Sequence, residues 1–338
     1  MAAQNNAPLP DGLEIAGYRI VKKIASGGFS IVYLAYDSEG NAVAIKEYLP
    51  SALALRQPGE LIPSVAKANL PIFHIGLKCF FEEGRALARI VHPNVVRVVN
   101  FFRANETVYM VMAYESGHAL QEHIARAVAK GGRLSEKFVR QVFNGVCGGL
   151  REVHANKLLH LDLKPANIYL RTDGSPLLLD FGAARQTIES DVPMLAPMYT
   201  PGFAAPELYA KGSQLGPWTD IYSIGAAMYA CMAGATPQPA DARKSEDKLL
   251  PQLDALELRY SKELVRMVRA CLALDPLARP QSVFALQKVL RTAPAAPAEP
   301  DAEQGRARAS DPEDAPRAGG WRGLVGRLGG LGRGKAGS

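Results

Sequence analysis

The chain has 338 residues, of which 48% are hydrophobic, and a formal net charge of +6. This length and apolar content allow one large or two medium domains with a well-filled core. A charge so small for the size gives no argument for nucleic-acid binding. The cysteines are scattered without a C-x-x-C pair, which favours reduced core thiols and a cytoplasmic location; they are Cys79, Cys147, Cys231 and Cys271.

Neither a secretory signal nor a membrane anchor is predicted. Residues 1–14 have no basic start and no apolar run, both of which a signal peptide requires. The longest apolar stretch, Ile221 to Ala235, contains Ser223 and is shorter than the roughly 20 residues that span a bilayer. We expect a buried helix there, capped by Thr219 or Asp220.

In chain order, the first predicted elements are an N-terminal tail, residues 1–17, and three strands at residues 20–24, 31–35 and 42–46. The turn between the first two strands is glycine-rich, Ala25-Ser26-Gly27-Gly28-Phe29-Ser30. Such a turn lets backbone N–H groups come close to phosphates, where side chains would clash. Taken by itself, the turn is equally compatible with an ordinary hairpin.

The segment that follows, residues 47–69, carries three prolines and is predicted to be an ordered loop insertion. A decorated surface without further use is the alternative. A helix is predicted at residues 80–90, and Glu82 and Glu83 point about 100° apart on it. The next predicted elements are strands at residues 95–102 and 108–112 and a helix at residues 134–156.

The most informative segment is His160-Leu161-Asp162-Leu163-Lys164-Pro165-Ala166-Asn167, followed thirteen residues later by Asp180-Phe181-Gly182. Asp162 can accept a proton from an attacking hydroxyl, and Lys164 can reach a transferred phosphate. Asn167 and Asp180 offer oxygen ligands suited to Mg²⁺. A short hairpin, predicted at residues 168–170 and 176–179 with Asp173-Gly174 at its turn, brings these two ligands together.

With both segments in this order, the chain resembles eukaryotic-type (Hanks-type) Ser/Thr protein kinases, in particular those of bacteria. Lys164, two residues after Asp162, resembles the Ser/Thr branch rather than the tyrosine kinases. The resemblance runs from about Tyr18 to about Leu290. It implies an α+β, bilobal protein-kinase fold over residues 18–292, with a small antiparallel β-sheet lobe and one helix at 18–113 and a larger, mostly helical lobe at 114–292.

The resemblance also implies ATP and Mg²⁺ as cofactors. Val43-Ala44-Ile45-Lys46 matches the strand whose lysine holds the α- and β-phosphates, and Glu83 matches the partner of that lysine, with Glu82 as the fallback. The implied catalytic residues are Asp162, Lys164, Lys46 and Glu83, and the implied metal ligands are Asn167 and Asp180. The implied ATP contacts are Ala25, Ser26, Gly27, Gly28, Phe29, Val32, Ala44, Lys46, Met112, Ala113, Tyr114, Glu115 and Tyr169.

Several positions depart from the family pattern. Ala25 and Ser30 replace the first and third glycines of the phosphate-covering loop, where small residues keep room for ATP. Tyr169 stands where the family usually has a smaller aliphatic residue, in the floor of the adenine pocket. Leu161 replaces an arginine that in many kinases reads a phosphate on the activation segment. We therefore expect activity without phosphorylation of Thr187, Ser190, Tyr199 or Thr200.

Further positions match the larger lobe of the family. Ala205-Pro206-Glu207 ends an activation segment that begins at Asp180, and Arg279 is the expected partner of Glu207 in a buried ion pair. Asp220 is expected to hold the backbone of the catalytic loop, alone or together with a role as a helix N-cap. Thr200 is expected to lie beside Asp162 and Lys164.

These features predict Mg²⁺-dependent transfer of the γ-phosphate of ATP to Ser/Thr hydroxyls of protein substrates, with a cognate phosphatase as an optional partner. One alternative is a pseudokinase scaffold that binds partners without catalysis, which the filled catalytic positions disfavour. Another is a small-molecule phosphotransferase of similar fold, a class that usually lacks the Ala-Pro-Glu platform.

The C-terminal residues, 293–338, are Ala/Pro-rich and then Gly/Arg-rich, and are predicted to form a disordered tail. Within residues 321–328, arginines lie between apolar residues at helical spacing, which leaves peripheral contact with an anionic membrane as an alternative. Nine glycines between Gly319 and Gly337 oppose a stable helix, so a solvated tail is favoured.

Overall fold

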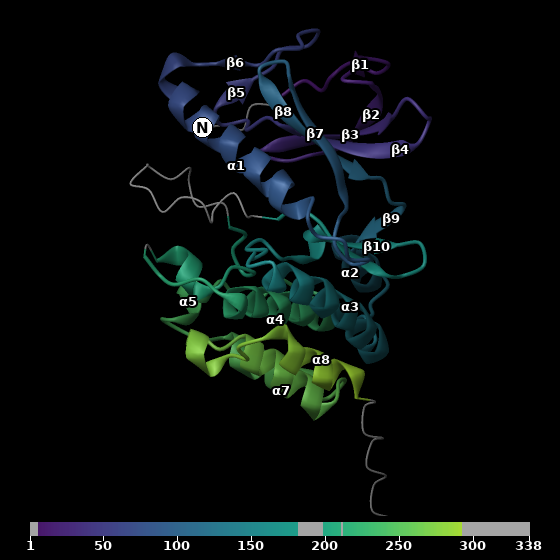
Figure 1. Ribbon diagram of the computed structural model, residues 1–338. Helices are drawn as coiled ribbons and strands as arrows, with labels where there is room; N and C mark the ends of the chain where they lie inside the picture. The colour runs from purple at the N-terminus through teal and green to yellow at the C-terminus, as the bar shows by residue number, and fades with distance from the viewer. Residues whose placement is uncertain (1–5, 182–198, 211, 293–338) are drawn as a thin grey trace, which may run out of the picture. The chain divides into compact units, whose positions relative to one another are not determined.

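The structure is a computed structural model that describes residues 6–181, 199–210 and 212–292. Contacts divide the chain into two units, residues 1–295 and residues 296–338. All elements below belong to the first unit (Figure 1). The tail predicted to be disordered lies outside the described residues.

The small lobe is built on a six-stranded antiparallel sheet with the strand order β1-β2-β3-β4-β8-β7. The bounds are β1 Glu14–Ile15, β2 Tyr18–Ser26, β3 Ser30–Tyr36, β4 Ala42–Tyr48, β7 Val98–Ala104 and β8 Thr107–Ala113. Buried residues alternate along β3, with Ile31, Tyr33 and Ala35 in the core. This period of two is expected for a strand that packs one face on a core. Each strand predicted in this region is present.

Helix α1, Leu70–Leu87, begins ten residues before its predicted start. Pro71 lies in the first turn, where its missing N–H removes no helical hydrogen bond. The rings of Phe73 and Phe80 pack on Tyr48 at the end of β4, with centroid distances of 5.3 and 5.7 Å. These contacts give the first turns a buried face, and tertiary packing of this kind is what stabilises most helices.

Residues predicted to be an N-terminal tail, 1–17, pack on the small lobe from Asn6 onward, which corrects that prediction. Leu9 is 1% exposed, and its N–H donates to Tyr33 Oη at 3.1 Å. Farther along, β1 pairs with β2. The segment has too short an apolar pattern to be recognised in the sequence, because single residues rather than a periodic face anchor it.

The predicted insertion, residues 47–69, contains a small hairpin, β5 Ala54–Leu55 with β6 Ser64–Val65, and a 3₁₀ turn, Lys67–Asn69, that leads into α1. The insertion is anchored to the sheet through the buried residue Arg56.

Arg56, in the insertion, is 1% exposed and lies against Glu47 of β4. Its guanidinium donates to both oxygens of the Glu47 carboxylate, at 2.6 and 2.7 Å, and Arg56 Nε donates to the carbonyl of Ala7 at 2.8 Å. The hydroxyls of Tyr33 and Tyr109 donate to the same carboxylate, each at 2.7 Å. Burial and the charge of Glu47 raise the pKa of both tyrosines, so they stay neutral donors. The network joins three strands, the insertion and the N-terminal segment.

Replacing Arg56 with methionine is expected to lower the free energy of unfolding by about 3–5 kcal/mol, because the Glu47 carboxylate is left buried without its cation. Urea unfolding of the full chain measures this. The matched control is Gln57→Ala at the next, exposed position, with a change below about 0.5 kcal/mol. Adding Glu47→Gln to Arg56→Met should recover part of the loss, and equal stability of Arg56→Met and wild type would contradict the role.

The larger lobe is mostly helical. The helices that the structure describes here are α2 Leu120–Ala129, α3 Glu136–Ala155, α4 Pro217–Ala233, α5 Ala240–Arg243, α6 Leu249–Leu256, α7 Lys262–Cys271 and α8 Val283–Arg291. Helix α3 packs against α8, and α4 against α7 (Figure 1). Helix α4 is buried along most of its length, as predicted for residues 221–235, and Gly234 ends it in the left-handed conformation, with φ 69°. Within the described ranges, no helix has both the length and the apolar character needed to cross a membrane.

A three-stranded sheet with the order β11-β10-β9 carries the predicted hairpin. Its strands are β9 Gly117–Ala119, β10 Ile168–Arg171 and β11 Pro176–Leu178. Gly174 at the hairpin turn has φ 81°, a conformation that favours glycine. The hairpin directly follows the loop at residues 160–167, so it determines where that loop ends.

Candidate active site

Asp220 of α4 fixes the start of the loop at residues 160–167. The backbone N–H groups of His160 and Leu161 donate to its two carboxylate oxygens, at 2.9 and 2.8 Å, and His154 Nε2 lies 2.8 Å from the same carboxylate. Although burial acts to raise it, the pKa of Asp220 is lowered by the hydrogen bond and charge of His154. Leu161 has φ 60°, a conformation that leucine rarely adopts. The predicted contact of Asp220 with the loop backbone is therefore formed, and it holds a strained turn.

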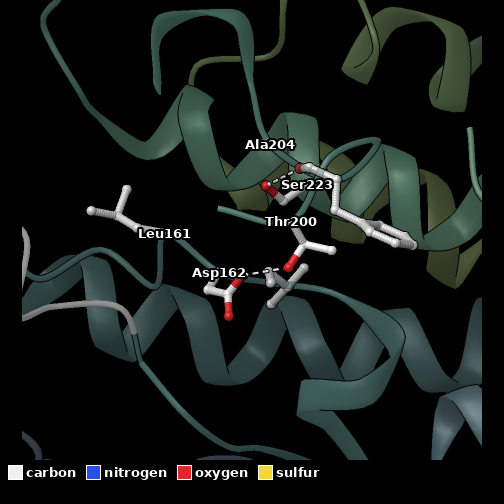
Figure 2. A pocket seen from close by; sticks show the side chains of 7 residues that line it. Leu161, Asp162, Thr200, Ala204 and Ser223 are labelled. Atoms are coloured by element: carbon white, nitrogen blue, oxygen red, sulfur yellow. Dashed lines mark hydrogen bonds between the residues drawn. The ribbon is translucent and has the colours of Figure 1, made fainter. Parts of the chain in front are cut away.

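Asp162 lies at the centre of a hydrogen-bonded cluster, and Figure 2 shows its bond with Thr200. Lys164 Nζ donates to Asp162 Oδ2 and to Thr200 Oγ1, each at 2.8 Å, and Thr200 Oγ1 donates to Asp162 Oδ1 at 3.2 Å. Asn167 Nδ2 donates to the Asp162 carbonyl at 2.8 Å and to Oδ2 at 3.1 Å. The predicted place of Thr200 is confirmed. The cluster holds a carboxylate beside an ammonium group, so one site can accept a proton and neutralise an anion.

The β10–β11 hairpin joins Asn167 to Asp180, since the N–H of Leu179 donates to the Asn167 carbonyl at 2.9 Å. The amide nitrogen of Asn167 is bound to Asp162, and its side-chain oxygen accepts no hydrogen bond from another described residue. Amide and carboxylate oxygens are the hard ligands that Mg²⁺ prefers, together with phosphate oxygens and water. The described residues contain no group of three or more His, Cys, Asp or Glu suited to a metal. The side-chain oxygens of Asn167 and Asp180 are of the kind that fits a magnesium ion.

The predicted Lys46–Glu83 ion pair is absent from the described residues, where Lys46 Nζ pairs instead with Asp180 Oδ1, at 2.8 Å. Glu83 is 6% exposed, whereas Glu82 is partly exposed beside Arg85, so burial favours Glu83 over the fallback. Burial, opposed by the charge of Lys46, raises the pKa of Glu83 to about 7. The pKa of Asp180 is lowered by Lys46 in spite of burial. The ion pair with Lys46 thus keeps Asp180 the stronger of the two acids.

Replacing Glu83 with glutamine is expected to stabilise the fold more at pH 8 than at pH 5. The native pKa of about 7 lies above the ordinary value of 4.5, so the native state binds the proton more tightly than the unfolded chain. Glu83 therefore lowers the free energy of unfolding as the pH rises from 4.5 to about 7, by roughly 3 kcal/mol.

Urea unfolding of wild type and Glu83→Gln at both pH values, without nucleotide, measures this difference. Glu82→Gln, on the more exposed neighbour, is the matched control for the loss of one carboxylate and should change the free energy of unfolding by less than about 0.5 kcal/mol. A Glu83→Gln difference that is the same at pH 5 and pH 8 would contradict the raised pKa.

The glycine-rich turn, residues 25–30, keeps open space on one side. A Cβ added at Gly27 or Gly28 would meet no heavy atom within 4 Å, and neither residue has a positive φ. Neither the fold nor the backbone conformation therefore requires glycine here, and the missing side chains leave room for a ligand to approach the backbone closely. Within the described part of the chain, the N–H groups of Gly28 and Phe29 have no hydrogen-bond acceptor. They are available to phosphate oxygens.

The predicted adenine contacts lie along paired strands. Ala44 pairs with Met112, and Val32 with Lys46, so these side chains lie in adjoining positions of the sheet. Tyr169 Oη donates to the Glu115 carbonyl at 3.4 Å. The side chain thus reaches the segment between β8 and β9 that was predicted to bind the base; that segment also holds Tyr114, and Ala113 is the last residue of β8.

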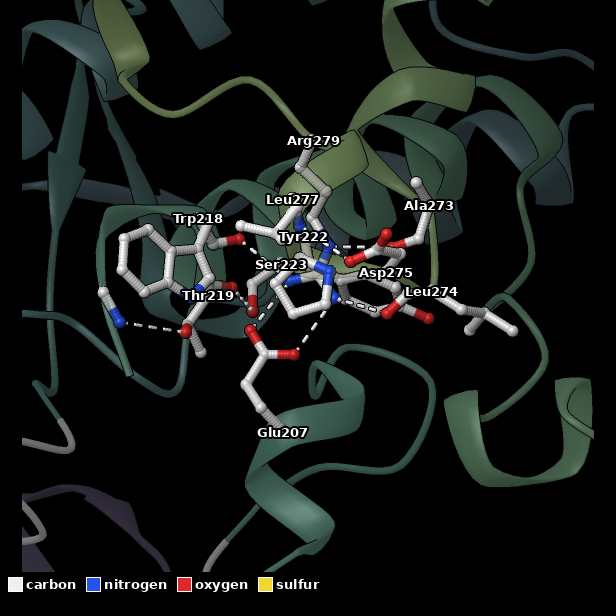
Figure 3. A network of polar contacts seen from close by, with 12 residues as sticks. Glu207, Trp218, Thr219, Tyr222, Ser223, Ala273, Leu274, Asp275, Leu277 and Arg279 are labelled. Carbon is white, nitrogen blue, oxygen red and sulfur yellow. Dashed lines mark hydrogen bonds and ion pairs between the residues drawn. The ribbon is translucent and has the colours of Figure 1, made fainter. Parts of the chain in front are cut away.

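Glu207 and Arg279 form the predicted buried pair (Figure 3). The two guanidinium nitrogens donate to the two carboxylate oxygens at 2.8 and 3.0 Å. Arg279 also donates to the carbonyls of Trp218 and Leu274, and its guanidinium lies 5.0 Å from the ring centroid of Tyr222. The end of the activation segment is thus fastened to α4 and to the turn before α8.

One contact at the site had no sequence signal. The ring of His160 stacks on Phe181, with centroids 4.4 Å apart, and its Nε2 lies 3.0 Å from the carbonyl of Leu179. Burial lowers the pKa of His160, so the ring is neutral and Nε2 carries the proton. The stack ties the catalytic loop to the residue after Asp180.

Comparison with known proteins places this geometry in a family. A model of the protein kinase domain matches residues 18–290, and the chain belongs to that family. The match confirms the predicted α+β, bilobal fold, and the chain is an enzyme of the serine/threonine protein kinase class.

Three relatives illustrate the likeness. The chain is 26% identical over 300 residues to serine/threonine-protein kinase 16 of Homo sapiens, covering 83% of this chain and 92% of that protein. It is 28% identical to serine/threonine-protein kinase PknD of Chlamydia abortus, over 80% of this chain and 30% of the relative. The solved structure titled "PpkA-294 apo form" is 34% identical with a TM-score of 0.74, covering 84% of this chain and 99% of that one.

Proposed function

We propose that the chain transfers the γ-phosphate of ATP to Ser/Thr hydroxyls of protein substrates with the help of Mg²⁺. The observation that carries this proposal is the cluster of Asp162, Lys164, Asn167 and Thr200, joined by the hairpin to Asp180 and by Asp180 to Lys46. Phosphoryl transfer requires these groups in one place: a proton acceptor, cations along the phosphates and oxygen ligands for the metal.

Each residue would act through a contact described above. Asp162 orients the substrate hydroxyl and accepts its proton, while Lys164, which already bonds the same carboxylate, neutralises charge on the transferred group. Asn167 and Asp180 would hold Mg²⁺, which when bound screens the negative charge of the phosphates. The free N–H groups of Gly28 and Phe29 would bind phosphate oxygens.

Lys46 has two acidic neighbours, Asp180 and Glu83, and their arrangement suggests how the site changes when the nucleotide binds. Asp180 and Glu83 both raise the pKa of Lys46 against the opposing effect of burial. If Asp180 held Mg²⁺, Lys46 would be free to bind the phosphates and to pair with Glu83. The pairing predicted from the sequence then belongs to the nucleotide-bound enzyme.

Asp162→Asn is expected to lower kcat by about 10²–10⁴-fold, because a proton acceptor is lost while the shape of the loop is kept. Lys46→Met should lower kcat/KM by a comparable factor. Transfer of radiolabelled phosphate from ATP to casein, with the thermal midpoint recorded alongside, measures both.

The matched control for Lys46→Met is Lys248→Met at an exposed lysine, which should keep wild-type activity. A wild-type chain that binds Mg²⁺-ATP but transfers no phosphate would favour the pseudokinase alternative. Undiminished transfer by Asp162→Asn would overturn the role given to Asp162.

We also propose that activity needs no phosphate on the activation segment. Leu161 is 2% exposed and packs in the crevice that Asp162, Thr200, Phe203 and Ser223 also line, so this position holds an apolar contact where a phosphate-binding cation would be required. Thr187 and Ser190, two of the candidate sites, lie outside the described residues.

Thr187→Ala, Ser190→Ala and Tyr199→Phe are expected to keep kcat/KM within about twofold of wild type. The reason is that position 161 has no cation that could bind a phosphate on these residues. Phenylalanine is chosen at 199 because that ring packs on Tyr209, with centroids 4.3 Å apart. The measurement is casein kinase activity of each variant.

Thr200→Ala should lose activity at least tenfold, and Thr200→Ser should keep it, because the hydroxyl bonds Asp162 and Lys164. A large loss in Thr187→Ala or Ser190→Ala would contradict phosphate independence.

Cytoplasmic location and a cognate phosphatase remain predictions, for which the free, buried cysteines and the phosphorylation chemistry are the support. Membrane contact through residues 321–328 remains the less favoured alternative, and that segment lies outside the described residues.

A further inference from the structure

Residues 49–55 of the insertion, called the clamp loop below, are anchored to the small lobe at both ends. It starts directly after β4, and the residue that follows it, Arg56, returns to Glu47 at the end of that strand through two hydrogen bonds of 2.6 and 2.7 Å. Inside the loop, the N–H groups of Leu53 and Ala54 both donate to the carbonyl of Pro50, at 3.0 and 2.9 Å. Leu49 and Ala54 are buried in the core. A loop with buried ends and an internal turn can hold a neighbour in place.

That neighbour is the glycine-rich turn. Ser51 donates twice to the carbonyl of Gly28, from its backbone N–H at 2.9 Å and from its hydroxyl at 3.2 Å. Leu49 donates to the carbonyl of Phe29 at 2.8 Å. A carbonyl oxygen has two lone pairs, so Ser51 fills both acceptor positions of Gly28. The glycine-rich turn is therefore bonded to the clamp loop at two successive carbonyls.

The orientation of one peptide follows from this contact. In a planar trans peptide the C=O and the N–H point in opposite directions. With the Gly28 carbonyl turned toward Ser51, the Phe29 N–H of the same peptide points away from the clamp loop. That N–H has no acceptor among the described residues, and an added Cβ at Gly28 meets open space.

We propose that Ser51 is a positioning residue for the nucleotide: by holding the Gly28 carbonyl, it presents the Phe29 N–H to a phosphate oxygen. The inference rests on the proposed function, since the ligand is the phosphate chain of ATP. It gives the insertion a function in nucleotide binding. It also accounts for how a turn with only two glycines keeps a phosphate-binding shape, since the clamp loop supplies a fixed backing.

The test compares a ligand that has phosphates with one that lacks them. Calorimetric titration of the full chain with Mg²⁺-ATP and with adenosine gives both dissociation constants. Ser51→Ala removes the hydroxyl bond and is expected to weaken ATP binding about two- to fivefold, the effect of one partly exposed hydrogen bond, while adenosine binding is unchanged. Ser51→Thr keeps a hydroxyl and should restore ATP binding.

Ser64→Ala, at an exposed position of β6 in the same insertion, is the matched control and should bind both ligands as wild type does. Equal weakening of ATP and adenosine by Ser51→Ala would show a merely structural role, and no change in either would show that the contact is idle; each overturns the inference while the proposed function stands. A wild-type chain that binds neither ligand would overturn the proposed function, and this inference with it.

Discussion

The catalytic groups depend on one buried anion, the carboxylate of Asp220. It binds two consecutive backbone N–H groups of a loop whose second residue, Leu161, has a strained left-handed conformation. Backbone strain of this kind persists only where surrounding bonds impose it. With the turn fixed, Asp162 has one direction in which to point, and the bonds from Lys164 and Asn167 follow from it. The groups proposed for proton acceptance, charge neutralisation and metal binding therefore all follow a turn that Asp220 fixes.

The small lobe uses a second buried anion in the same way. Glu47 adjoins Lys46 on β4, and because side chains alternate along a strand, bonds to Glu47 hold the strand from the face opposite the lysine. Arg56 and two tyrosines donate four hydrogen bonds to the two oxygens of the Glu47 carboxylate. The negative charge is therefore compensated although it is buried. Asp220 in the larger lobe and Glu47 in the small lobe thus each hold backbone next to residues of the proposed site, and neither is itself proposed to take part in the reaction.

The sequence made the catalytic loop, the hairpin, the Glu207–Arg279 pair and the place of Thr200 predictable, because short motifs determine local backbone geometry and the family pattern supplies the partners. It did not reveal Arg56, whose burial depends on contacts with Glu47 and Ala7, or the order of the N-terminal segment. Both arise from tertiary packing without periodicity. The pairing of Lys46 with Asp180 rather than with Glu83 was equally hidden, because it depends on the distances between side chains from separate elements, which no motif reports.

The replacement of arginine by Leu161 becomes intelligible when the contacts of the activation segment are taken together. Its last residues are already fixed without a phosphate: Thr200 bonds Asp162 and Lys164, Ser223 donates to the carbonyl of Phe203 at 2.8 Å, and Glu207 binds Arg279. An arginine at position 161 would add a cation beside Asp162 that needs an anion to balance it, whereas the buried Leu161 lines a narrow crevice there. These contacts support the proposal that the described end of the activation segment, from residue 199 onward, is held without a phosphate by neutral packing and a buried ion pair.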